Sequence, residues 1–66
     1  MKMISVNSSA IDAIGYDSKT QQMKIKFKDS GTYTFCGVPQ SIFDNFLDAN
    51  SKGQYYHKYI RDKYNC

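Results

Sequence analysis

Residues 23–28, MKIKFK, constrain the fold more than any other part of the chain, because apolar side chains alternate strictly with lysines. The alternation continues in residues 31–35, GTYTF, after the turn-forming pair Asp29-Ser30. A period of two is typical of a β-strand with one buried face and one face in water. Two such strands joined by a short turn predict a hairpin with rings on one face and lysines and threonines on the other.

The length of the turn follows from which side chains must share a face. A two-residue turn would place a tyrosine opposite a lysine and mix apolar and charged side chains. A three-residue turn places Phe27 opposite Tyr33 and Ile25 opposite Phe35, which keeps each face uniform. We therefore expect the three-residue turn, with Gly31 in the left-handed backbone conformation of a G1 bulge.

Further strands are expected before the hairpin. Residues 10–16 are typical of a strand that ends at a polar turn, and residues 4–6 are expected as a short edge strand. An even-numbered connection after the longer strand pairs Ile14 with Ile25 on the apolar face. These segments together predict an antiparallel meander.

The periodicity changes after Pro39, which suits the first turn of a helix because its nitrogen carries no hydrogen. The apolar side chains of residues 42–47 fall on one stripe of a helix, with acidic and amide side chains opposite. The sequence SKGQ then matches a capping box, in which Ser51 accepts a hydrogen bond from the third helical N–H. A second helix is expected from about Lys52 to Lys63.

The predicted fold class is α+β: a three- or four-stranded antiparallel meander followed by two C-terminal helices packed on one face. Sixty-six residues suit one small domain near the lower limit for a single hydrophobic core. The domain is expected to take in residues 1–66, with its core over about 4–64. So small a core makes dimerisation or docking onto a larger protein a reasonable expectation.

The second helix separates into two chemically different halves at about 100° per residue. We expect the apolar half to pack on the sheet, Tyr56 and Tyr59 included, and the basic half to lie in water. The apolar half holds Tyr55, Tyr56, Tyr59 and Ile60. The basic half holds Gln54, His57, Lys58 and Arg61.

Cys36 and Cys66 are the only cysteines, and no C-x-x-C spacing occurs. The N-terminal residues lack the apolar run of a signal peptide, and no segment approaches the length of a membrane span. These features favour a cytoplasmic chain with two free thiols and leave a disulfide as the alternative. Zinc would need a fourth ligand beside these cysteines and His57, so we expect neither a metal nor another cofactor.

An enzymatic activity is not expected. Cys36, His57 and an aspartate form the only combination resembling a nucleophile, a base and an orienting group. A chain this short has little room for a substrate cleft beside its core, and the sequence contains no glutamate.

Several short motifs occur in an order that resembles the KTSC domain family: GYD near the first turn, an aromatic-x-aromatic strand running into GVP, then A-x-SKG-x-YY and IRDKY. The similarity extends from about Ile4 to Tyr64. KTSC domains are small modules found at the C-terminus of some lysyl-tRNA synthetases and as free-standing proteins, with no established activity. The association with synthetases implies an RNA-binding role. The central Y-x-Y of the family is Tyr33-Thr34-Phe35 here, which omits the second hydroxyl.

The residues expected to contact RNA or another anionic partner are the basic residues of the second helix, its first turn and the lysines of the hairpin. Free N–H groups at a helix start attract anions, and a row of lysines can follow a phosphate backbone. The alternatives are a serine that only caps its helix and lysines that keep an edge soluble. The full set is Ser51, Lys52, Gly53, His57, Lys58, Arg61, Lys24, Lys26 and Lys28.

The net charge of +3 favours anionic partners without requiring one. We expect a basic accessory module that holds RNA by electrostatic contacts with little sequence selectivity. The alternative is a protein-interaction or homodimerisation module that uses an uncovered apolar edge. Tyr33 and Phe35 are expected under the helices, which would keep them from stacking on bases.

Overall fold

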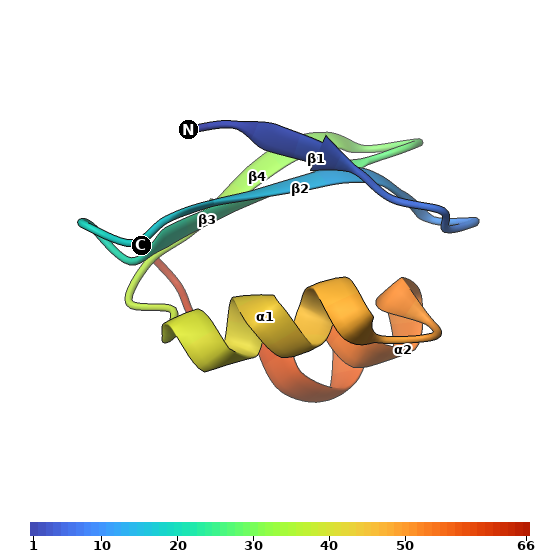
Figure 1. Ribbon diagram of the computed structural model, residues 1–66. Coiled ribbons are helices and arrows are strands. Elements are labelled where there is room, and N and C mark those ends of the chain that lie inside the picture. The colour runs from blue at the N-terminus through green and yellow to red at the C-terminus, as the bar shows by residue number, and fades with distance from the viewer.

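The alternating segments form the last two strands of a four-stranded antiparallel sheet in the computed structural model, which describes residues 1–66 (Figure 1). The sheet is a meander in the order β1-β2-β3-β4, as expected. Its strands are β1 (Met3–Ser5), β2 (Ile11–Asp17), β3 (Gln22–Phe27) and β4 (Gly31–Phe35).

The hairpin register differs from the expected one by two residues. Phe27 pairs with Gly31 and Ile25 pairs with Tyr33, so the expected pairing of Phe27 with Tyr33 is wrong. A shift of two residues leaves every side chain on the same face, and the lysines still lie opposite threonines. The left-handed conformation expected for Gly31 is confirmed by its φ of +87°, and the pairing of Ile14 with Ile25 is also confirmed.

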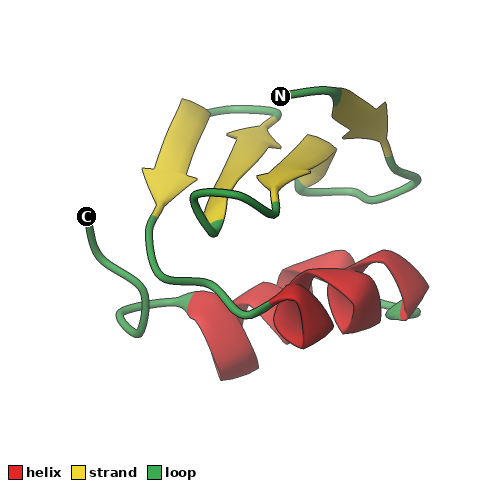
Figure 2. Ribbon diagram, turned by 60° about the vertical axis from the view of Figure 1, so that its left-hand side comes forward, coloured by secondary structure: helices red, strands yellow, loops and turns green.

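Helices cover one face of the sheet, as both ribbon views show (Figures 1 and 2). The first helix, α1 (Gln40–Asp48), begins directly after Pro39 and buries Phe43 and Phe46. The second begins as α2 (Lys52–Tyr55) and continues as a π-helical turn, η1 (Tyr56–Ile60). None of the helices is both long enough and apolar enough to span a bilayer.

The second helix ends at Ile60 and not at Lys63 as expected. The Arg61 amide donates to the Tyr56 carbonyl at 2.8 Å, which closes a wider turn than an α-helix has. Arg61 then leaves helical geometry with ψ 128°, and Asp62 follows with φ +63°. The chain therefore turns away soon after Ile60, which helical periodicity alone did not reveal.

The apolar half of the second helix faces the core and the basic half faces water, as expected, with one correction. Ile60 is fully buried, Tyr55 and Tyr56 are half-buried, and the basic half is exposed. Tyr59 is 41% exposed, so its expected place in the packed layer is wrong. The physical reason is that Tyr55 lies between it and the core: Tyr55 stacks on the buried Phe46 at 5.2 Å and contacts Tyr59 at 4.7 Å between ring centroids.

The hydrophobic core lies between the sheet and the helices. Two tyrosine hydroxyls make long-range hydrogen bonds around it. Tyr16 of β2 donates to the carbonyl of Val38, in the connection from β4 to α1, at 2.6 Å. Tyr55 of α2 donates to the carbonyl of Ile42 in α1 at 2.9 Å and so joins the two helices. Burial raises the pKa of Tyr55, and the neighbouring Tyr59 and Tyr64 add to the shift. The core cluster consists of Ile11, Ile14, Met23, Ile25, Phe35, Val38, Phe43, Phe46 and Ile60.

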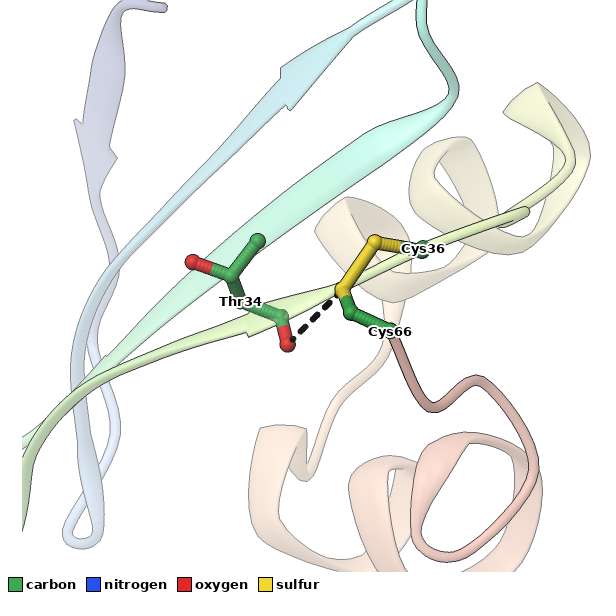
Figure 3. The surroundings of a disulfide bond; sticks show 3 residues. All are labelled: Thr34, Cys36 and Cys66. Carbon is green, nitrogen blue, oxygen red and sulfur yellow. Dashed lines mark hydrogen bonds between the residues drawn. A yellow bond between two sulfur atoms is a disulfide. The ribbon is translucent and has the colours of Figure 1, made fainter.

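A disulfide joins Cys36 to Cys66, where two free thiols were expected (Figure 3). The turn at Asp62 returns the C-terminal residues to the end of β4, and the two Cα atoms lie 4.8 Å apart, a separation that suits a disulfide. Cys66 Sγ also lies 3.5 Å from the Thr34 carbonyl oxygen, a contact and not a hydrogen bond, since a disulfide sulfur carries no proton. The bond fastens the tail to the sheet.

We expect Gly31→Ala to lower the free energy of unfolding by about 1–2 kcal/mol, the cost of a left-handed backbone for a residue with a Cβ. Nothing lies within 4 Å of a Cβ built at Gly31, so the cost comes from the backbone alone. Gly53→Ala is the matched control, and it should not lower the free energy of unfolding. A Cβ at this position would meet only the Ala10 Cβ at 3.9 Å, and alanine is a better helix former than glycine by about 1 kcal/mol. Urea denaturation measures both, and an unchanged midpoint for Gly31→Ala would contradict the assigned turn.

Candidate functional site

The structure divides the expected site residues between two sides of the molecule. Lys24 and Lys26 project from the sheet face that the helices leave open, opposite threonines of β4. Lys26 is partly neutralised by Asp12, with 3.7 Å between Nζ and Oδ2. Lys28 follows β3 in the three-residue turn before Gly31. The remaining candidates belong to the helical layer, so no single flat surface presents all of them.

The start of the second helix holds its own polar groups. The Ser51 hydroxyl accepts from the Gln54 N–H at 3.3 Å, as the capping box predicts. Lys52 Nζ donates to the carbonyl of Ala49, directly after α1, at 2.5 Å. These intramolecular partners give Ser51 and Lys52 a structural role at the start of α2, which is a single turn.

The basic residues of η1 and the arginine that directly follows it are exposed to water. We call His57, Lys58 and Arg61 the basic cluster; all three are exposed. Arg61 Nη1 lies 3.3 Å from His57 Nδ1, as one helical turn between them allows. Arg61 Nε lies 3.9 Å from the Asp62 carboxylate, and Lys58 Nζ lies 5.4 Å from the centre of the Tyr59 ring. Arg61 is therefore held loosely in place, with most of its N–H donors free.

Beside the basic cluster lies an open pocket of about 280 Å³. It is formed where the hairpin turn meets the start of the second helix, and most of its wall is aromatic. Phe27 contacts Tyr33 at 5.6 Å and Tyr56 at 5.0 Å between ring centroids, both edge to face. We call it the aromatic pocket. Its lining residues are Ala10, Phe27, Ser30, Tyr33, Gly53, Tyr56 and His57.

The exposure of Tyr33 corrects the expectation that both aromatic residues of β4 are covered by the helices. Phe35 is buried, with 8% of its surface exposed, but Tyr33 is 49% exposed. β4 is an edge strand, and the second helix contacts its buried end at Phe35, through Tyr56, with 6.0 Å between ring centroids. The alternation of the strand predicted the face of Tyr33 but not the extent of the helical layer above it.

The pocket was missed by reasoning from the sequence, although His57 and Gly53 were named for other reasons. The available signal was the excess of rings over what one core can seal: the chain has six tyrosines and four phenylalanines. Only the tertiary structure shows which of them stay open. Phe27 and Tyr56 are half-buried and Tyr33 is exposed, so these three provide ring faces that a ligand can reach.

No arrangement for metal binding or thiol chemistry accompanies this pocket. No group of three or more histidine, cysteine or acidic side chains lies close enough to hold a metal ion. Cys36 is bonded to Cys66, so it offers no free thiol to pair with His57. The site presents ring faces, hydroxyl groups and positive charge, and these are groups that suit the binding of a ligand.

Comparison with known proteins matches residues 7–64 to the KTSC domain. A protein from Tsukamurella paurometabola is 36% identical over 62 residues, which are 94% of this chain and 92% of that one. A lysine–tRNA ligase from Nostoc punctiforme is 32% identical over 62 residues, which are 94% of this chain but 11% of the ligase. The crystal structure of a KTSC domain protein from Yersinia pestis has a TM-score of 0.94 and 38% identity, covering 96% of this chain and 89% of that one. The resemblance and the fold class expected from the sequence are confirmed.

Proposed function

This chain belongs to the KTSC domain family, and from that premise we propose that it is an accessory module that binds single-stranded RNA through the basic cluster. The observation that carries the proposal is the exposed contact between His57 and Arg61, 3.3 Å apart. With Nδ1 of His57 accepting from the guanidinium, the second ring nitrogen carries the proton and points its N–H elsewhere. The two side chains then offer several N–H donors to one phosphate.

Charge supports an anionic partner on this side of the molecule. Lys58 lies on the same turn as His57 and Arg61, and η1 contains no acidic residue. Asp62 is the one carboxylate in contact with the cluster, and its side chain is 90% exposed, so it offsets little of the positive potential. Similarity to a lysine–tRNA ligase supports RNA as the polyanion.

The lysines of the open sheet face stand outside this proposed contact surface. Lys24 and Lys26 alternate with the buried Met23 and Ile25, so they lie on the sheet face away from the helices, and Lys26 already contacts Asp12. A role in solubility explains them, since lysines on a sheet discourage association with other strands. They therefore provide a control surface with the same chemistry.

A test compares two double variants with the same change in charge. Lys58→Glu with Arg61→Glu is expected to weaken binding of a labelled single-stranded RNA at least tenfold in fluorescence anisotropy. Lys24→Glu with Lys26→Glu is expected to change the affinity by less than about threefold when both variants are compared at an ionic strength of about 0.1 M, because attraction across more than a Debye length, about 10 Å at that salt concentration, is screened. Equal losses in both variants, or no binding by the unmodified chain at low salt, would contradict the proposal.

The salt dependence of the same assay separates this function from protein interaction. Contacts with two or three phosphates predict that the logarithm of the affinity falls with the logarithm of the salt concentration with a slope of about −1.4 to −2.1. The alternative is suggested by Met1 and Ile4, which are 50% and 41% exposed at the β1 edge of the sheet. A partner on that edge, or a second copy, would bind with little salt dependence and respond to Ile4→Lys.

The proposal keeps the expected cytoplasmic location, where RNA is available. A reducing compartment favours free thiols, so the assay is run with and without reductant. The basic cluster lies before the tail that the disulfide fastens, and we expect RNA affinity to change by less than about threefold on reduction, because no charge of the cluster is altered.

A further inference from the structure

We propose that the aromatic pocket is a nucleobase subsite that takes one base of the RNA strand held by the basic cluster. The inference rests on the proposed function and adds to it a site and a class of ligand. The pocket differs in chemistry from the basic cluster, because most of its lining residues are aromatic or carry a hydroxyl. It adjoins the basic cluster in space, because His57 belongs to both.

The arrangement of the rings suits a flat ligand. Tyr33 and Tyr56 each contact Phe27 edge to face, with interplanar angles of 61° and 74°, and no ring contact joins the two tyrosines. The pocket is therefore lined by two tyrosine rings that share Phe27 as a neighbour. Tyr33 is 49% exposed, which leaves a face of its ring free for stacking. Every base can stack on such a face, because every base has a π-face of its own.

The volume limits the ligand to something small. Pockets for drug-sized ligands usually measure about 300–1,000 Å³, and this one measures about 280 Å³. One heterocycle fits such a space, whereas two stacked bases or a folded peptide segment do not. Only a single unpaired base of a flexible strand can enter it, as single-stranded RNA recognition requires.

Charge decides between the two kinds of ligand that an aromatic pocket usually takes. A cage for a quaternary ammonium ion gains from negative charge nearby, but no carboxylate lines this pocket. Its rim carries His57, with the Arg61 guanidinium 3.3 Å from the imidazole. A base that carries its own phosphate matches both parts: the ring enters the pocket and the phosphate meets the basic cluster.

Polar groups for the edge of a base are also present. Ser30, Tyr33 and Tyr56, three of the residues that line the pocket, each carry a hydroxyl. None of these hydroxyls makes a hydrogen bond within the protein, whereas the hydroxyls of Tyr16 and Tyr55 do. Hydroxyls both donate and accept, so these groups can serve any of the bases. We therefore expect stacking with weak selectivity.

The test compares a short single-stranded RNA with an abasic strand of equal length and charge. The unmodified chain is expected to bind the base-bearing strand about 5- to 150-fold more tightly, the range for one stacked base. Tyr33→Ala should remove this preference and leave binding of the abasic strand unchanged. Tyr59→Ala is the matched control, because Tyr59 is also largely exposed, at 41%, but does not line the pocket; it should keep the preference.

A second readout reports the stacking itself. The fluorescence of 2-aminopurine placed in the strand falls when the base stacks, and we expect the unmodified chain and Tyr59→Ala to quench it but Tyr33→Ala not to. If the abasic strand binds as tightly as the base-bearing one, the base subsite is wrong, the RNA function stands, and the pocket must take another ligand such as an apolar side chain. If neither strand binds at low salt, both proposals are wrong.

Discussion

Replacement of Cys36 and Cys66 by serine is expected to lower the free energy of unfolding by about 3 kcal/mol. The bond joins residues 30 positions apart, and closing a loop of that length in the unfolded chain removes about 3–4 kcal/mol of entropy in the chain-entropy account. Cys66 is exposed and Cys36 is half-buried, so changing sulfur to oxygen costs little by itself. Small domains near the lower size limit often depend on such a bond.

Urea denaturation of the unmodified chain with and without reductant provides the control. The reduced chain should match the double variant within about 0.5 kcal/mol, the usual size of a surface substitution. Using both serines avoids a lone thiol that would pair two chains. Equal stability of the oxidised, reduced and variant chains would show that the tail contributes nothing and would contradict the tether between β4 and the C-terminus.

Phe46→Ala is expected to cost about 3–5 kcal/mol, because it empties a fully enclosed site in the core. Phe46 is 0% exposed and stacks on Tyr55 with an interplanar angle of 15°. A domain of this length has a total stability of about 3–10 kcal/mol. The variant should therefore be largely unfolded, or melt far below the unmodified chain in circular dichroism.

Tyr59→Ala tests the same stack from its outer side. Tyr59 contacts the other side of Tyr55 at 4.7 Å, but it is 41% exposed and its removal leaves no closed cavity. We expect a loss of about 1 kcal/mol or less, in line with an exposed aromatic pair. If Tyr59→Ala destabilised the domain as much as Phe46→Ala, the assignment of inner and outer sides to the second helix would be wrong.

The strands and their faces could be predicted because side-chain parity is a strong local signal. Alternation in residues 23–28 set which side chains face the helices, and Ile14 pairs with Ile25 as that parity requires. Parity does not fix the register, since any shift by two residues satisfies it equally. The observed pair Phe27–Gly31 is as consistent with the sequence pattern as the pair that we expected.

The features that escaped prediction depend on contacts between distant segments. The disulfide needs the turn at Asp62 to bring Cys66 back to β4, and no spacing in the sequence shows that turn. The aromatic pocket needs Tyr33 to lie beyond the cover of the helices, which depends on where η1 ends. By contrast, the exposure of His57 follows from helical periodicity and was predicted correctly; Arg61 is also exposed as predicted, although it lies just beyond the end of η1.

An NMR titration of the isotope-labelled chain with single-stranded RNA at low salt tests most directly whether the helical side of the molecule holds RNA. We expect the amide signals of Ser30, Tyr33, Gly53 and residues 57–61 to shift together, because these residues line the aromatic pocket or carry the basic cluster. The signals of Lys24 and Lys26 should stay in place. Shifts confined to those two lysines and their neighbours on the open sheet face, or no shifts at all, would contradict this assignment.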